Sequence, residues 1–383
     1  MISLNTGYIG ALDHLRFFAA MLIAVFHLAN GEFVHYMHLD IGVPLFFTLS
    51  GYLFFIIAYN QKEKEIIYWK FLYNRILRIY PLITLLFLLT VVIMDNFTAL
   101  DFINLFGLNL PGKPRNSWAS GDWGGQYLSF NWWTIGVEFT FYLLFPFIFK
   151  FYKKYGILFL VKLFIFIIIL KFLLYYSFLE EYGWKKLGIS FNYSFFGNFD
   201  IFIIGMIVAH WTNTKTHAFY AIFSSKLFFI FYIVTMWYMI INFADELPLP
   251  LMTSYQALLC GGLIVLYQNA FCKIKDSFIN KLLSTLGSTS FSVYLLHDFI
   301  KNGINSMGIG DLFLNMFVDP SKYSSEQLQF ILLILYIPII LIMSNLSFNI
   351  IEEPFLSMRV KYFTNLKKLR KPKNEAYSKF PTS

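Results

Sequence analysis

Two ionisable side chains share one face of the first apolar segment, LDHLRFFAAMLIAVFHL, at residues 12–28. On an α-helix, Arg16 and His27 differ by about 20° after three full turns and by about 16 Å along the axis. A charge inside a bilayer costs at least about 2.5 kcal/mol, so such residues usually have a function. His27 is therefore a candidate general base. The alternatives are that Arg16 snorkels to the inner interface and that His27 makes a structural hydrogen bond inside the bundle.

A second cluster is an arginine pair in FLYNRILRIYPL, residues 71–82. Arg75 and Arg78 are three positions apart and therefore neighbours on a helix. Two adjacent guanidinium groups are suited to bind one anionic group. Ordinary anchoring of a membrane helix at its cytoplasmic end is the alternative interpretation.

A third cluster lies in NWWTIGVEFTFYLLFP, residues 131–146, where Tyr142 follows Glu138 on the same helical face. The predicted topology places both Glu138 and His27 in the outer half of the membrane. A carboxylate beside an imidazole fixes its tautomer and raises its basicity. We therefore expect Glu138 to face His27 and to orient it.

The remaining polar residues give weaker signals. His297, in SVYLLHDF, is either a site residue or a structural histidine. His35 and His38 lie on the first outer loop without a matching set of ligands, so we predict no metal site. Lys171 is expected to snorkel to the membrane surface.

The composition indicates which kind of secondary structure positions these residues. The chain has 383 residues, of which 58% are hydrophobic and only 14% charged, and a mean hydropathy of +0.60. Soluble domains average roughly 25% charged residues. We therefore predict an all-α, polytopic membrane domain over residues 1–355, followed by a basic cytoplasmic tail over residues 356–383.

A bilayer core requires roughly 20 apolar residues per helix, and about ten segments satisfy this requirement. They are residues 10–29, 41–60, 77–95, 129–149, 156–178, 194–211, 226–243, 250–269, 288–307 and 328–350. The ninth is the weakest, because Asp298, Lys301 and Asn302 interrupt it.

Lys and Arg residues concentrate in the loops on the side of the two termini, which predicts that both termini are cytoplasmic. This topology also explains the net charge of +8 without nucleic acid as a partner.

Seven motifs, in this order between residues 8 and 355, resemble the acyltransferase 3 family of integral membrane acyltransferases. They are LDHLRFFAAMLIAVFH, DIGVPLFFTLSGYLF, RILRIYP, WTIGVEFTFYLLFP, FIIGMIVA, GSTSFSVYLLH and IEEPF. Two positions depart from the family pattern. His14 stands where many members have Gly, and Phe139 stands where many have a second Glu, which leaves Glu138 as the carboxylate of its motif.

The resemblance implies an enzyme that moves an acyl group, most often acetyl, from cytoplasmic acyl-CoA to a hydroxyl of an extracytoplasmic or lipid-linked glycan. A bacterial inner membrane is the expected location, and no metal is expected. The implied catalytic residues are His27, Glu138 and Arg16, the CoA-binding residues are Arg75 and Arg78, and candidate positions along the substrate path are Tyr142, His297 and Ser50.

Several alternatives remain open at this point. His27 either deprotonates the acceptor directly, or the acyl group passes through an acyl-histidine or a nearby Tyr or Ser. The acyl group is acetyl, succinyl or another short chain, and the acceptor is a surface polysaccharide, peptidoglycan or a lipid-linked sugar. A transporter or flippase of glycans or lipids is the competing class, because polar residues in a helix bundle also suit a transport pathway. A non-catalytic scaffold would leave His27 and Glu138 unexplained.

Overall fold

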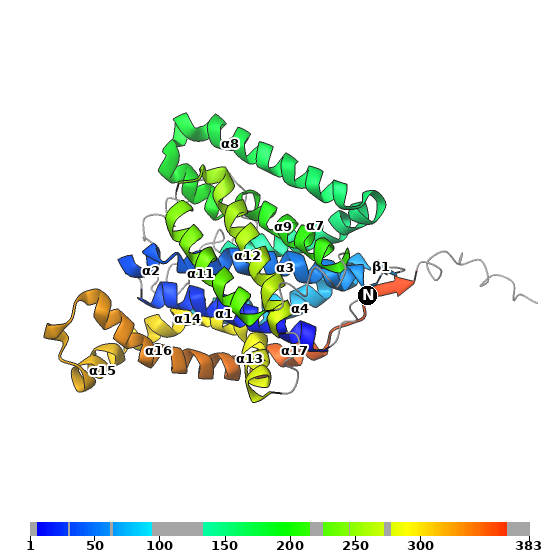
Figure 1. Cartoon of the computed structure of the whole chain (residues 1–383). Coiled ribbons are helices and arrows are strands. Elements are labelled where there is room, and N and C mark those ends of the chain that lie inside the picture. Colours follow the sequence, from blue (N-terminus) through cyan, green and yellow to red (C-terminus); the bar gives the residue numbers. More distant parts are fainter. Residues whose placement is uncertain are drawn as a thin grey trace, which may run out of the picture.

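The computed structural model describes residues 6–29, 31–61, 64–93, 133–214, 225–244, 246–271 and 277–365 (Figure 1). Over these residues the protein is a bundle of α-helices with one short two-stranded ribbon, which confirms the prediction of an all-α membrane protein. Residues 366–383 of the predicted basic tail lie outside the described part of the chain.

The described elements are given in the order of the chain. The first half contains α1 (Thr6–Ala29), α2 (Glu32–Tyr36), α3 (Gly42–Tyr59), β1 (Lys64–Ile66), α4 (Tyr68–Ile93), α7 (Trp133–Tyr155), α8 (Ile157–Asn192) and α9 (Phe195–Thr214). The second half contains α11 (Lys226–Phe243), α12 (Leu249–Phe271), α13 (Phe278–Ser288), α14 (Ser290–Ser306), α15 (Ile309–Phe317), α16 (Ser325–Ser347), α17 (Glu353–Ser357) and β2 (Phe363–Asn365).

Within the described residues, nine helices are long and apolar enough to cross a membrane. They correspond to nine of the predicted spans: Gly10–Ala29, Leu39–Tyr59, Tyr68–Leu89, Trp133–Tyr155, Ile157–Glu181, Phe195–Thr214, Lys226–Phe243, Leu249–Phe271 and Ser325–Ser357. The segment expected at 288–307 forms α14, which has 17 residues and packs against α1 and α16. Its neighbours therefore shelter the polar residues Asp298 and Lys301.

The bundle has two distinct ends (Figure 1). The helices α2 and α15 lie at one end, whereas β1 and α17 lie at the other. We name them the outer end and the inner end, after the topology predicted from the loop charges.

The helices α3 and α9 pack closely against each other. A Cβ atom added at Gly51 would lie 2.2 Å from the carbonyl oxygen of Phe202, and one added at Gly205 would lie 2.3 Å from that of Thr48. Only glycine permits this approach of two helix backbones. The contact fixes α3 in the bundle interior, and with it Ser50, the neighbour of Gly51.

Lys171 does not snorkel, and that expectation is wrong. Its side chain is 2% exposed, and its Nζ donates to Asp200 at 3.1 Å and to Thr253 at 2.7 Å. Asp200 is itself fully buried. The opposite charge inside the bundle therefore holds the ammonium group, and the resulting ion pair joins α8, α9 and α12.

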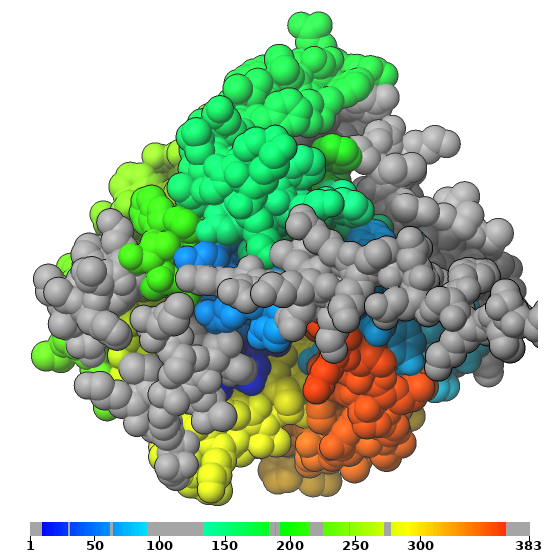
Figure 2. Space-filling model, turned by 90° about the vertical axis from the view of Figure 1, so that its right-hand side faces the viewer, coloured from blue at the N-terminus to red at the C-terminus, as the bar shows by residue number. Residues whose placement is uncertain are grey.

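The chain beyond α17 returns across α4. The side chain of Asn74 binds both backbone groups of Val360, donating to its carbonyl at 2.7 Å and accepting from its N–H at 2.9 Å. Tyr362 packs on Phe71 with ring centroids 5.5 Å apart, and β2 pairs antiparallel with β1. We call residues 358–365 the strap. Figure 2 shows this end of the molecule, where the red C-terminal residues lie beside the light-blue residues of α4.

Candidate active site

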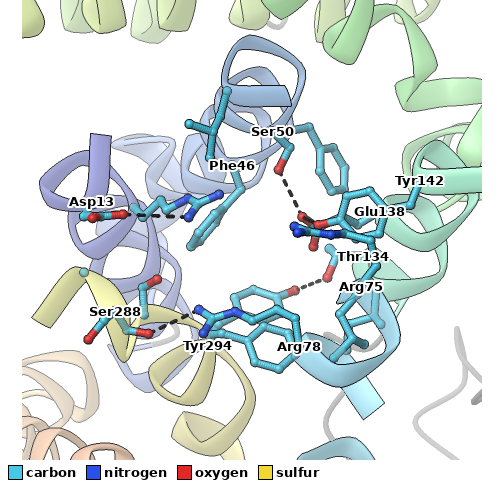
Figure 3. Close-up of a pocket in the computed structure, with 18 of the residues that line it drawn as sticks. Asp13, Phe46, Ser50, Arg75, Arg78, Thr134, Glu138, Tyr142, Ser288 and Tyr294 are labelled. Atoms are coloured by element: carbon cyan, nitrogen blue, oxygen red, sulfur yellow. Dashed lines mark hydrogen bonds and ion pairs between the residues drawn. The ribbon is translucent and has the colours of Figure 1, made fainter. Parts of the chain in front are cut away.

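A cavity of about 370 Å³ opens within the inner half of the bundle, which we call the inner cavity. Side chains of α1, α3, α4, α7 and α14 point into it (Figure 3). Its lining includes four arginines: Arg16, Arg75, Arg78 and Arg359. The cavity therefore concentrates positive charge at the end where the sequence predicts the cytoplasm.

Arg75 holds its charge among aromatic rings. Its guanidinium lies over Phe54 at 5.0 Å, over Phe71 at 5.5 Å and over Tyr142 at 5.9 Å. Within the described part of the chain it has no ion pair, and its buried Nε has no hydrogen-bond partner. A cation held by ring faces remains available to an anionic ligand.

Arg78 is held by two further elements. It donates to the carbonyl of Ser288 at 3.2 Å and lies 3.5 Å from the carboxylate of Glu352. Glu352 is fully buried, accepts a hydrogen bond from Ser292 and ends the π-helical turn Phe348–Glu352 that precedes α17. Glu352, the first glutamate of the IEEPF motif, therefore fixes the direction of the Arg78 side chain.

Arg16 and Arg359 complete the basic lining from opposite ends of the chain. Arg16 lies 3.8 Å from Asp13 on α1, so it faces the inner cavity. Arg359 belongs to the strap. Burial, and then repulsion from Arg75 and Arg78, lowers the pKa of Arg359 to about 10.

Arg359 was not among the predicted site residues and falls within the predicted tail. Its position directly after the IEEPF motif is the one signal in the sequence that would have drawn attention to it.

Glu138 lies in the wall of the inner cavity. Its carboxylate accepts hydrogen bonds from Ser50 at 3.0 Å and from Tyr142. The structure therefore brings together three of the residues selected from the sequence, on α3 and α7.

The expected contact of Glu138 with His27 is not formed between these two described side chains. His27 lies on a second cavity of about 150 Å³ at the outer end, which we call the outer cavity. The expectation failed because similar depth in the membrane does not fix the direction in which two helices turn their side chains. Glu138 faces α3 and the inner cavity, whereas His27 faces α14.

Three residues of α14 surround His27 on one side. Its ring lies 5.4 Å from that of His297, centroid to centroid, and Lys301 donates to its carbonyl at 2.6 Å. Asp298 also acts on it electrostatically. His297 is fully buried. It lies beside His27, where the sequence had predicted Glu138.

A row of side chains separates the two cavities. Val43 lines both of them. The ring of Tyr294 lies 6.0 Å from that of His297, and its hydroxyl is hydrogen-bonded to Thr134 at 2.7 Å. Because Tyr294 and Thr134 line the inner cavity, this row forms a thin wall between the arginine-lined space and His27.

The arrangement is suited to the transfer of a group between two ligands. A charged ligand can be held by the arginines at the inner end, with its reactive part directed toward Ser50 and Glu138. A second ligand at the outer end would meet an imidazole.

Comparisons with known proteins agree with this chemistry. A family model described as "Acyltransferase domain" matches residues 9–351. Acyltransferase MdmB of Streptomyces mycarofaciens is 28% identical over 171 residues, which are 38% of this chain and 40% of that protein. The match therefore spans less than half of the relative's length. No solved structure matches the chain.

Proposed function

The chain belongs to the acyltransferase 3 family and is a membrane acyltransferase, and from this premise we propose that it transfers an acyl group from acyl-CoA to a hydroxyl of a cell-envelope glycan. The observation that carries the proposal is the arginine-lined inner cavity, which meets the cavity of His27 at the wall formed by Val43. Acetyl is the acyl group we propose, and a bacterial inner membrane is the location.

Acyl-CoA would bind with its phosphates at the inner end. Arginine matches the geometry of phosphate oxygens and keeps its charge when partly buried. Arg75 forms no ion pair within the described part of the chain, and Arg78 is held in place by Glu352. The cavity volume of about 370 Å³ is near the lower end of the roughly 300–1,000 Å³ of sites for drug-sized ligands. It would therefore hold the acylated arm and the phosphates next to it, with the rest of CoA outside.

In the proposed reaction His27 accepts the proton of the acceptor hydroxyl. The hydroxyl oxygen forms a bond with the acyl carbon, the carbon–sulfur bond breaks, and the CoA thiolate leaves and takes up a proton. His297 and Asp298 act on the imidazole from α14. A relay through Ser50 or Tyr142 is the variant in which the acyl group first crosses the wall on the protein.

The competing function is transport of a glycan or lipid. Membership in an acyltransferase family argues against it. The proposed glycan acceptor rests on the family resemblance and on the polar lining of the outer cavity.

The test uses the protein in lipid nanodiscs with acetyl-CoA and the glycan fraction of the cells that carry it. We expect release of free CoA together with an acetyl ester on the glycan. The variant His27→Asn should abolish both. His38→Asn is the matched control, because His38 lies outside both cavities and has a φ of 48° that Asn adopts readily. Movement of glycan without release of CoA, or full transfer by His27→Asn, would refute the proposal.

A further inference from the structure

We propose that the outer cavity binds one neutral sugar ring of the acceptor and that Gln256 recognises a hydroxyl of this ring. The inference rests on the proposed function, because it names the acceptor class of the same enzyme. It is drawn from a buried amide group, an aromatic wall and the charges of the lining.

Gln256 carries a buried hydrogen-bond donor that is not used. The residue is 3% exposed, lines the outer cavity, and its Nε2 has no partner among the described residues. A buried polar group without a partner destabilises a protein. Such a group at a cavity wall, on the same cavity as His27, is explained by a ligand that accepts its hydrogen bond.

Contacts one helical turn earlier on α12 fix the position of Gln256. Thr253, one helical turn earlier on α12, is bound to Lys171 at 2.7 Å and to Asp200 at 3.2 Å. The buried ion pair therefore anchors the segment of α12 that presents the amide. A donor on a rigid element selects a hydroxyl at one position of a ligand.

One side of the outer cavity is aromatic. Trp133 and Tyr193 line it, with ring centroids 5.0 Å apart and ring planes at 73°. Phe26 lines it as well. A sugar ring has apolar C–H faces and polar edges, so it matches a cavity that combines aromatic walls with a few hydrogen-bonding groups.

The charge of the lining favours a neutral ring. The described residues that line the outer cavity include Asp40 and His27 but neither Lys nor Arg, whereas the inner cavity has four arginines. A ring that carries a carboxylate or a phosphate would meet Asp40 without a compensating cation in the lining. The two cavities therefore differ in the charge of the ligand that each accepts.

The size of the cavity limits the bound part to one ring. Its volume of about 150 Å³ is below the roughly 300–1,000 Å³ of sites that enclose drug-sized ligands. The rest of a glycan chain would remain beyond the outer end, and the hydroxyl to be acylated would lie near His27.

The experiment compares Gln256→Met with Gln329→Met in cells from which the native chain has been deleted. Methionine keeps the volume of glutamine and removes the amide. Gln329 is a matched control, because it lies near the start of α16, outside both cavities, and its Oε1 is also buried without a partner. Mass spectrometry of the envelope glycans locates the ester, and the melting temperature of each purified protein is measured with and without CoA.

We expect Gln256→Met to lower the ester content at least tenfold and Gln329→Met to leave it unchanged. The ester of the wild type should lie on a sugar without carboxylate or phosphate. The melting temperature of Gln256→Met should be unchanged or higher, and its shift on addition of CoA should equal that of the wild type.

Three results would overturn the inference while acyl transfer itself stands. They are a full ester content with Gln256→Met, an ester on an anionic sugar or a lipid, and a loss of melting temperature that assigns Gln256 a structural role. Cells with the wild type that form no ester dependent on acyl-CoA would instead remove the proposed function, and the inference with it.

Discussion

Replacement of Arg359 by Gln tests whether the strap is part of the donor site. Arg359 lines the inner cavity with three other arginines, and the strap is held there by Asn74 through both backbone groups of Val360. If the side chain contacts a phosphate of acyl-CoA, its loss should raise KM for acetyl-CoA and leave kcat nearly unchanged.

The size of the expected change in KM follows from the type of contact that Arg359 would make and from the exposure of its side chain to water. A hydrogen bond to a charged group contributes about 1.5–3 kcal/mol, and partial exposure of Arg359 to water reduces this to roughly the lower limit. Since 1.4 kcal/mol corresponds to about tenfold in affinity, we expect KM to rise about tenfold. Asn74→Ala should raise KM in the same direction by releasing the strap.

The assay measures CoA release against acetyl-CoA concentration for Arg359→Gln, Asn74→Ala and the double variant. Lys361→Gln is the control, because Lys361 is exposed on the same strap and does not line the cavity. The double variant should be no worse than Arg359→Gln alone, since both changes remove one interaction. An unchanged KM with Arg359→Gln, or an equal effect of Lys361→Gln, would refute the reasoning.

Three further predictions follow from the same structure. Binding of CoA, measured by titration, should weaken as salt rises, because the four arginines of the inner cavity attract phosphate. Gly51→Ala should lower the melting temperature, because the added Cβ would lie 2.2 Å from a backbone oxygen, whereas Gly303→Ala, which meets nothing within 4 Å, should not lower it. Lys171→Met should lower the free energy of unfolding by about 3–5 kcal/mol, because it leaves Asp200 buried and unpaired. The double variant with Asp200→Leu should recover much of this loss. A double variant as unstable as the single one would contradict this account.

Much of the fold could be predicted from the sequence because a bilayer leaves few solutions for the backbone. Nine spans appear where apolar runs of sufficient length predict them. The segment at 288–307 was the difficult case, because its polar residues are sheltered by α1 and α16, which hydropathy does not report. Lys171 was misjudged for a related reason, since its partner Asp200 lies on another helix.

The contacts among the predicted site residues followed from the sequence only in part. The i, i+4 spacing of Glu138 and Tyr142 predicted a contact that the structure contains, and the i, i+3 spacing of Arg75 and Arg78 predicted two side chains that line one cavity. The pairing of Glu138 with His27 was wrong because it depends on how helices are rotated about their axes. Arg359 was missed because a strap after the last helix has no periodic signal, and its place is fixed by Asn74, far away in the sequence.

The separation of His27 from Glu138 narrows the ways in which the proposed transfer can occur. An acyl group held in the inner cavity is divided from the imidazole by Val43 and by the hydrogen-bonded pair of Tyr294 and Thr134. Direct transfer therefore requires this wall to open, whereas a relay requires a side chain of the inner cavity to carry the acyl group. The two routes differ in what Tyr294→Phe would do. Loss of its hydroxyl should free the ring and alter direct transfer, but should leave acylation of Ser50 or Tyr142 by acetyl-CoA intact. Mass spectrometry of the protein after brief exposure to labelled acetyl-CoA distinguishes them, because a labelled side chain is formed only in a relay.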